Sequence, residues 1–203
     1  MPERYLRQSA LAHLGLESRA VDDPGDAGLV LCERAHLGKV GLRGDAGDKG
    51  FLDAVAKELG FALPLRPNTV AAGEDVTAFW LGPNEWLLAV IPYEGTPLAE
   101  DLDKALTGLH AGATVLTDSR TVIGVSGPAA RDVLAKGCPL DLHPSAFPSG
   151  SCAQSLLAKA DVLIYLHEDG GRFDLYVPRS YADYLWRWLE DAGAEYGVAV
   201  SGD

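Results

Sequence analysis

The chain has few of the features that mark secreted, membrane-spanning or disulfide-rich proteins. Its three cysteines, Cys32, Cys138 and Cys152, are an odd number without a Cys-x-x-Cys pair, so we expect reduced, buried thiols. The longest apolar runs, such as residues 161–166, are too short to span a bilayer. Residues 1–20 contain no uninterrupted apolar segment, so we expect no secretory signal and a cytoplasmic location.

Positive charge is also scarce. Seventeen Lys and Arg residues against 29 Asp and Glu residues give a formal net charge of −12 at pH 7, and the pI is about 4.7. Such a surface repels phosphate backbones and anionic lipids, so we expect neither a nucleic acid nor a membrane as partner. Apolar residues make up 47% of the 203 residues, which is typical of a soluble globular protein with one domain or two small ones.

Metal-binding motifs are missing as well. The five histidines form no His-x-His or His-Glu-x-x-His pair. Cys138, His143 and Cys152 could be read as zinc ligands, but they lack a fourth ligand and a known zinc spacing. The sequence therefore predicts no metal site in this chain.

Two glycine-rich segments resemble catalytic or cofactor loops only in part. Residues 44–50 have the glycines of a phosphate loop, but Asp45 and Asp48 would repel a pyrophosphate, which favours a turn that leads into a helix. Ser126 lies in Gly-Val-Ser-Gly-Pro, a near match to a nucleophile elbow, without the element order of a hydrolase sheet. We therefore assign no catalytic and no cofactor-binding residue.

An internal repeat is the most informative feature that is present. Residues 39–45 and 122–128 share a pattern in which Gly41 and Gly124 are offset by 83 positions. Downstream, residues 60–67 and 137–144 match with an offset of 77, so the second intervening helix is shorter by about six residues. We interpret the chain as an α+β protein of two pseudo-symmetric β-α-β-β-α-β units, although a chance similarity would give the same pattern.

The apolar periodicity places these elements. It predicts strands over residues 29–43, 76–82, 86–91, 114–125, 153–166 and 172–177. Helices are expected at residues 51–59, 96–109, 128–136 and from residue 180 onward. The predicted organisation is an N-terminal arm at 1–27, a first unit at 28–112 and a second unit at 113–203.

Three apolar residues are candidates for docking to a partner. Leu11 and Leu14 lie in the predicted arm, where they could pack on the body of this chain or on another protein. The last helix is expected to bury the side of Tyr181, Tyr184, Leu185, Trp188 and Leu189. Trp186 lies about 120° from the centre of that side, which leaves two interpretations, a partner-facing anchor and a second buried contact within the chain.

Several segments in combination carry a family resemblance. They are Gly82–Leu88 (GPNEWLL), Ser126–Ala130 (SGPAA), Gly137–Leu142 (GCPLDL) and Arg179–Trp186 (RSYADYLW). Together they resemble the gamma subunit family of heterotetrameric sarcosine oxidase, over most of residues 29–190. That family is similar to the first two domains of the glycine-cleavage T-protein and to other folate-binding, aminomethyltransferase-like proteins.

The resemblance implies a non-catalytic subunit of a four-subunit complex. The alpha, beta and delta subunits would be its partners, mainly alpha, and would hold FAD, FMN, NAD, zinc and tetrahydrofolate. Such a complex oxidatively demethylates sarcosine to glycine, passes the one-carbon unit to tetrahydrofolate and forms peroxide. A related amine demethylase with another N-methyl substrate is a further interpretation of the same resemblance.

An alternative is a standalone folate-binding, aminomethyltransferase-like protein that uses the cleft between its two halves. T-protein-like chains tend to have Asp-x-Ser at the start of the strand before the Gly-Pro helix. The corresponding positions here are Val115 and Thr117, and Asn84 stands where the gamma subunit family commonly has Asp. The departure at Val115 and Thr117 weighs against a folate site in this chain, whereas a turn tolerates the change at Asn84.

Overall fold

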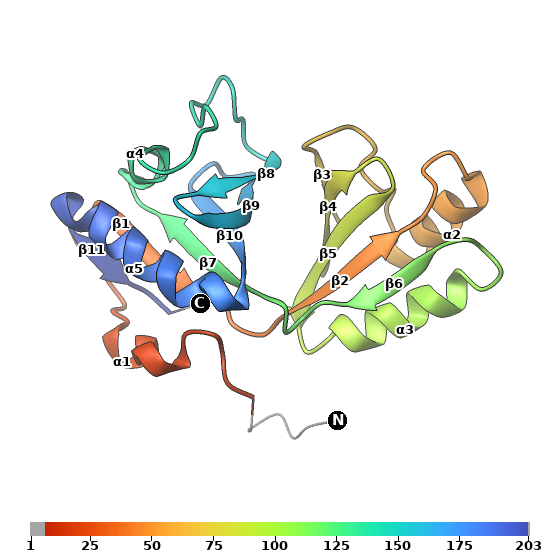
Figure 1. Cartoon of the computed structure of the whole chain (residues 1–203), viewed down its shortest axis with the longest axis horizontal. Helices are drawn as coiled ribbons and strands as arrows, with labels where there is room; N and C mark the ends of the chain where they lie inside the picture. The colour runs from red at the N-terminus through yellow and green to blue at the C-terminus, as the bar shows by residue number, and fades with distance from the viewer. Residues whose placement is uncertain (1–6, 203) are drawn as a thin grey trace. The chain divides into compact units, whose positions relative to one another are not determined.

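The computed structural model describes residues 7–202, which form two compact units with one β-sheet each, as Figure 1 shows. The five-stranded unit comprises residues 36–118 and 150–153. The six-stranded unit comprises residues 7–35, 119–149 and 154–202. The expected α+β class is confirmed.

The observed units differ from the predicted division at 28–112 and 113–203. The single strand predicted for residues 29–43 is two strands, β1 (Leu29–Glu33) and β2 (Leu37–Arg43), and each belongs to a different sheet. His36 between them has a left-handed φ of 64°, which interrupts the extended backbone. The first strand of the predicted first unit therefore completes the sheet of the other unit.

In the five-stranded unit the chain continues from β2 in an order close to the predicted one. The elements are α2 (Lys49–Leu59), β3 (Val70–Ala72), β4 (Val76–Gly82), β5 (Glu85–Pro92), α3 (Gly95–Ala105) and β6 (Gly112–Val115). The sheet order is β3-β4-β5-β2-β6, and all neighbouring strands are antiparallel. The short strand β3 was not predicted.

Helix α2 begins where the acidic glycine loop ends. The Asp48 side chain accepts a hydrogen bond from the Gly50 N–H at 2.8 Å, and Gly60 ends the helix with a left-handed φ of 79°. The loop amides thus have carboxylate partners, which confirms the interpretation of residues 44–50 as a turn into a helix. Apolar residues of α2 and α3 pack with β2, β4 and β5 in one core that includes Phe51, Trp86 and Leu102.

The six-stranded unit contains the remaining elements. They are α1 (Leu16–Arg19), β1, β7 (Arg120–Ser126), α4 (Ala130–Ala135), β8 (Cys152–Leu157), β9 (Ala160–Leu166), β10 (Arg172–Pro178), α5 (Ala182–Gly193) and β11 (Val198–Val200). The sheet order is β11-β1-β7-β10-β9-β8. β11 pairs with β1 in parallel, while β1, β7, β10 and β9 pair antiparallel with one another.

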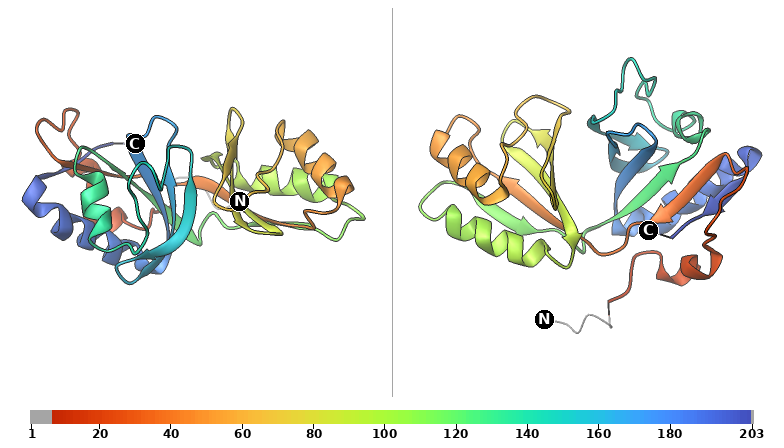
Figure 2. Two further views of the ribbon diagram at one scale, coloured as in Figure 1. Left: turned by 90° about the horizontal axis from the view of Figure 1, so that it is seen from above. Right: turned by 180° about the vertical axis from the view of Figure 1, so that it is seen from behind.

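Helices α4 and α5 lie on one face of this sheet, as Figure 2 shows. Arg131 of α4 lies over the Phe173 ring at 5.2 Å, and a Cβ on Gly193 of α5 would lie 2.5 Å from Leu29 Cδ2. Leu29 and Phe173 belong to the same face by strand register, because Leu31 is opposite Val125 and Val125 is opposite Phe173. No helix among residues 7–202 is long and apolar enough to cross a membrane.

The described part of the predicted N-terminal arm belongs to the six-stranded unit. Residues 1–6 lie outside the described residues. Leu11 is fully buried and its N–H donates to Glu33 Oε1 at 3.3 Å, and Val21 N–H donates to the Val200 carbonyl at 2.9 Å. Leu11 as a partner contact is therefore wrong, because its side chain already fills a place in its own unit. Leu14 is half-buried, so its docking role stays a prediction.

The exposed side of α5 also differs from the predicted one. Trp186 is fully buried, whereas Tyr181 and Tyr184 are 44% and 36% exposed. Tyr181 belongs to a 3-10 turn before the helix, so the 100° step of an α-helix does not extend to it. Ala182 and Gly193 are small residues on the buried side of α5, and they allow the helix to lie close to the sheet. The buried residues of the helix are Ala182, Leu185, Trp186, Leu189 and Gly193. The buried-contact interpretation of Trp186 is confirmed, and the partner-anchor interpretation is wrong.

Candidate functional site

The buried polar side chains of the described residues are Lys39, Thr121 and Asp174. Thr121 Oγ1 donates to Glu33 Oε1 at 3.0 Å, and Lys39 Nζ donates to the Leu37 carbonyl at 2.7 Å. Asp174 differs because it brings together three basic side chains, Arg34, His167 and Arg172. We call these four residues the Asp174 cluster and treat it as the candidate site.

Strand alternation places Asp174 on the sheet face opposite α4 and α5. Its neighbours Phe173 and Leu175 belong to the helix-covered face, so Asp174 points the other way. In register, Asp174 is opposite Tyr165 on β9 and Gly124 on β7. These positions bring the carboxylate to the middle of the sheet.

Gly124 leaves the space that the cluster uses. A Cβ at this position would lie 2.5 Å from Cys32 Sγ and 3.8 Å from Asp174 Oδ1. Gly124 is opposite Cys32 on β1 and Asp174 on β10, so it separates those two side chains in the strand register. The absence of a side chain lets Arg34, which follows β1, reach across β7 to Asp174.

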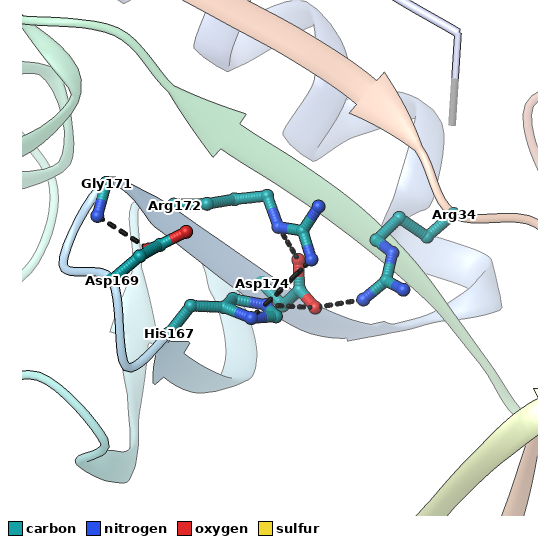
Figure 3. Close-up of polar contacts among 6 residues, drawn as sticks. All are labelled: Arg34, His167, Asp169, Gly171, Arg172 and Asp174. Atoms are coloured by element: carbon teal, nitrogen blue, oxygen red, sulfur yellow. Dashed lines mark hydrogen bonds and ion pairs between the residues drawn. The ribbon is translucent and has the colours of Figure 1, made fainter. Parts of the chain in front are cut away.

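Figure 3 shows the contacts of the carboxylate. Asp174 Oδ2 accepts hydrogen bonds from Arg34 Nη1 at 2.5 Å and His167 Nε2 at 2.8 Å. Arg172 Nε lies 3.6 Å from Asp174 Oδ1, a distance that makes an ion pair without a hydrogen bond. Arg172 Nη2 lies 3.3 and 3.5 Å from the two ring nitrogens of His167.

The cluster keeps Asp174 ionised. Burial by itself would raise the pKa of this carboxyl, because a charge is costly in a low dielectric. The hydrogen bond from His167 and the charges of Arg34, His167 and Arg172 outweigh burial, so the pKa of Asp174 lies below its usual value. The carboxylate is therefore a permanent negative charge at neutral pH.

Two tyrosines next to the cluster are neutral. Burial raises the pKa of Tyr165 and of Tyr176, and Asp174 adds to the rise for both. The Tyr165 ring packs on the His167 ring with centroids 4.5 Å apart. The tyrosines contribute packing to the cluster and no charge.

The cluster is an electrostatic anchor rather than a nucleophilic site. Ser126 is opposite Arg172 in the β7–β10 register, and the His167 N–H donates to the Arg172 carbonyl from the other side. The side-chain hydrogen bonds of His167 and Asp174 among the described residues join them to each other and to arginines, and none joins them to the Ser126 hydroxyl. Ser126 has no activating base in this arrangement.

The cysteines lie in separate surroundings. Cys138 Sγ is 3.7 Å from Ser155 Oγ, whereas Cys152 Sγ is 3.5 Å from the Thr69 carbonyl oxygen. Burial raises the pKa of Cys152 to about 12, so this thiol is protonated and unreactive. Within residues 7–202, no three or more His, Cys, Asp or Glu side chains form a group that could hold a metal ion.

A surface hollow of about 820 Å³ lies at one end of the five-stranded sheet, lined partly by Arg43, Asn84, Glu85 and His110. Arg43 and Glu85 form an ion pair at 2.9 Å with side chains 74% and 43% exposed. A smaller hollow of about 360 Å³ includes Arg120, Leu156 and Asp161. Water competes for the charges of the exposed Arg43–Glu85 pair and weakens their interaction. The larger hollow is therefore a weaker candidate site than the Asp174 cluster.

The positions that correspond to Asp-x-Ser in T-protein-like chains do not fit a folate site. Val115 is apolar and 43% exposed. Thr117 Oγ1 accepts a hydrogen bond from the Lys39 N–H at 3.1 Å, which ties this hydroxyl to the backbone of β2. We therefore derive no folate chemistry from these residues.

Sequence reasoning missed the Asp174 cluster, although signals were present. The segment Arg-Phe-Asp-Leu-Tyr-Val places Asp174 inside a strand between apolar residues, where a carboxylate needs a partner. The four-residue turn 168–171 brings His167 opposite Arg172. Arg34, 140 positions from Asp174, carried no local signal.

Comparison with known proteins confirms the family resemblance. The "Sarcosine oxidase, gamma subunit family" matches residues 43–195. The sarcosine oxidase subunit gamma of an Arthrobacter species is 38% identical over 193 residues, which cover 94% of this chain and 92% of the relative.

Solved structures agree in fold. A chain of heterotetrameric sarcosine oxidase from Corynebacterium sp. U-96, solved with pyrrole 2-carboxylate, superimposes with a TM-score of 0.84 at 32% identity. The match covers 96% of this chain and 98% of that chain. Aminomethyltransferase T of the glycine cleavage system from Bartonella henselae gives a TM-score of 0.69 at 17% identity, covering 97% of this chain and 59% of that one, a likeness of fold alone.

Proposed function

Because the chain belongs to the sarcosine oxidase gamma subunit family, we propose that it is the gamma subunit of a heterotetrameric sarcosine oxidase. The observation that carries the proposal is the match to a chain of the Corynebacterium sp. U-96 enzyme, which extends over nearly the full length of both chains. A shared length and fold favour the same place in the same kind of complex.

The proposed role is assembly rather than catalysis. The chain would pack mainly against the alpha subunit and meet beta and delta in the same cytoplasmic complex. FAD, FMN, NAD, zinc and tetrahydrofolate would be held by the partner subunits, where sarcosine is demethylated to glycine, the one-carbon unit passes to tetrahydrofolate, and peroxide forms. This role is supported by the candidate site. Its buried Asp174 carboxylate is paired with Arg34 and His167, and no general base is hydrogen-bonded to the Ser126 hydroxyl among the described residues.

The proposal includes a common origin for the two units, as pseudo-symmetric copies of one fold. It is supported by the sheet orders β3-β4-β5-β2-β6 and β8-β9-β10-β7-β1-β11, in which β1 takes the place that β6 has in the other unit and β11 is an additional edge strand. The helices follow the same rule, because α2 and α4 come after β2 and β7, and α3 and α5 come after β5 and β10.

The test is to co-express the chain with the alpha, beta and delta subunits from its own organism and to purify the product through a tag on this chain. We expect a yellow four-subunit complex that forms peroxide when sarcosine is added. The control omits this chain and carries the tag on the alpha subunit, and we expect it to give a lower yield of assembled enzyme.

Two results would contradict the proposal. The first is full assembly and activity of the other three subunits in the absence of this chain. The second is a chain that elutes alone and colourless. Saturable binding of tetrahydrofolate by the isolated chain would then support the standalone folate-binding alternative.

A further inference from the structure

Arg172 has poorer hydrogen-bonding partners than the other members of the Asp174 cluster. Its Nε is buried and has no hydrogen-bond acceptor among the described residues, and it lies 3.6 Å from Asp174 Oδ1. His167 Nε2 already donates to Asp174, so only Nδ1 can accept from Arg172, at 3.5 Å. A guanidinium held in this way has N–H groups in need of a better acceptor.

The charge of the cluster points in the same direction. Arg34 and Arg172 both face the one carboxylate of Asp174, so Arg172 shares this acceptor with a second guanidinium. The adjacent Tyr165 and Tyr176 add no negative charge, because burial raises the pKa of both.

The acids of the turn between β9 and β10 form no ion pair with Arg172 in the described part of the chain. Glu168 and Asp169 occupy the exposed turn between β9 and β10, where water screens them. Asp169 Oδ1 accepts a hydrogen bond from the Gly171 N–H at 2.9 Å, so its carboxylate is held by its own turn, as Figure 3 shows.

Arg172 is also accessible at its outer end. Its side chain is 38% exposed, against 21% for Arg34 and for His167 and 1% for Asp174. A buried carboxylate thus fixes the inner edge of a guanidinium whose remaining donors reach the surface. A planar donor fork held this way matches a carboxylate in a bidentate geometry.

We infer that Arg172, held by Asp174 and His167, is a binding site for an acidic side chain, Asp or Glu, of another subunit of the complex. This inference rests on the proposed function. A protein side chain is the source that fits, because assembly would bring the surfaces of other subunits against the exposed end of Arg172. A carboxylate on a protein surface brings its own enclosure when the two surfaces meet.

The test compares Arg172→Gln with Arg187→Gln in the co-expressed complex. Arg187 is the matched control, since it is also an arginine with an Asp partner, at 2.9 Å, but its side chain is 63% exposed on α5. We expect Arg172→Gln to raise the dissociation constant of this chain from the other subunits by about 30-fold or more. Arg187→Gln should change it less than about threefold.

A second variant keeps the test valid if Arg172→Gln folds poorly. Arg172→Lys keeps the charge and most of the packing, and its amine reacts with a carboxylate under zero-length carbodiimide cross-linking. In the assembled complex, mass spectrometry should find position 172 joined to an Asp or Glu of another subunit. Products confined to this chain, such as a link to Asp174, would overturn the inference.

The remaining outcomes separate the inference from the proposed function and from a small-molecule source. Equal assembly of wild type and a folded Arg172→Gln variant overturns this site alone, whereas failure of the wild type to assemble overturns the proposed function and this site with it. A free carboxylate as the ligand would appear as stabilisation of the isolated wild type, but not of Arg172→Gln, by sodium acetate over sodium chloride at equal ionic strength. That result, with assembly unchanged, would overturn the assignment to a partner side chain.

Discussion

Two carboxylates of the six-stranded unit are each paired with a histidine and an arginine, but they lie in opposite environments. Asp174 is 1% exposed and is held by Arg34, His167 and Arg172. Asp183 on the outer side of α5 is 43% exposed, and it accepts hydrogen bonds from His13 Nε2 at 2.8 Å and Arg187 Nε at 2.9 Å.

The pKa of both carboxyls is lowered, for different reasons. For Asp183 the hydrogen bonds from Arg187 and His13 act almost without a burial penalty. For Asp174 the basic partners first have to overcome burial, which acts in the other direction. The same set of side chains is therefore optional for stability on the surface and obligatory in the interior, where an unpaired charge has no water to solvate it.

Asp174→Asn is the change with the largest expected effect. It leaves two guanidinium groups around a neutral amide, and breaking a buried ion pair in this way typically costs about 3–5 kcal/mol. We expect the free energy of unfolding of the isolated chain, measured by urea denaturation, to fall by that amount. A loss below about 1 kcal/mol would mean that Asp174 behaves like a surface carboxylate and would break the comparison.

Trp186→Ala tests the inner side of the same helix that carries Asp183. Truncating a fully buried tryptophan removes packing and leaves a cavity, at a cost of about 3 kcal/mol, the lower end of the usual range. The lower end is expected because Trp186 Nε1 is buried without a hydrogen-bond partner among the described residues, and the substitution removes that cost. Urea denaturation measures the effect, and Tyr181→Ala, at a residue 44% exposed, is the control that should change little.

Acid titration tests the linkage of the Asp174 carboxyl to folding. Unfolded Asp has a pKa of about 3.9, and the pKa of folded Asp174 is lower, so the unfolded chain takes up the proton first as the pH falls. The stability that Asp174 contributes is complete above about pH 4 and is lost as the pH falls through the folded pKa. Urea midpoints between pH 5 and pH 2 should fall more steeply for wild type than for Asp174→Asn, and parallel curves would show that Asp174 is not linked to folding.

Asp183→Asn has the smallest expected effect. Exposed ion pairs contribute about 0.2–1 kcal/mol, and solvent screens this one on both sides. The free energy of unfolding should fall by less than about 1 kcal/mol, and 1 M salt should reduce the difference from wild type further. A loss as large as that of Asp174→Asn would remove the distinction between surface and interior.

The fold was more predictable from sequence than the candidate site. The turn at residues 44–50 and the helix after it follow from local contacts, since Asp48 caps α2 and Gly60 ends it. The Asp174 cluster joins residues from β10, the β9–β10 hairpin and the end of β1, and only the hairpin part is local. Gly124 was noticed as part of a repeat, but its effect depends on Cys32 and Asp174 being its neighbours across the sheet.

The sequence by itself determined the helices, most of the strand segments, the α+β class and the family resemblance, because helix caps, turns and apolar periodicity act over a few residues. Tertiary structure alone decided that β1 joins β7 while β2 enters the other sheet, that α5 buries Trp186 and exposes Tyr181, and that Arg34 meets Asp174. Each of these depends on which surfaces exclude water from one another once distant segments pack, and burial is a property of the packed chain rather than of a local pattern.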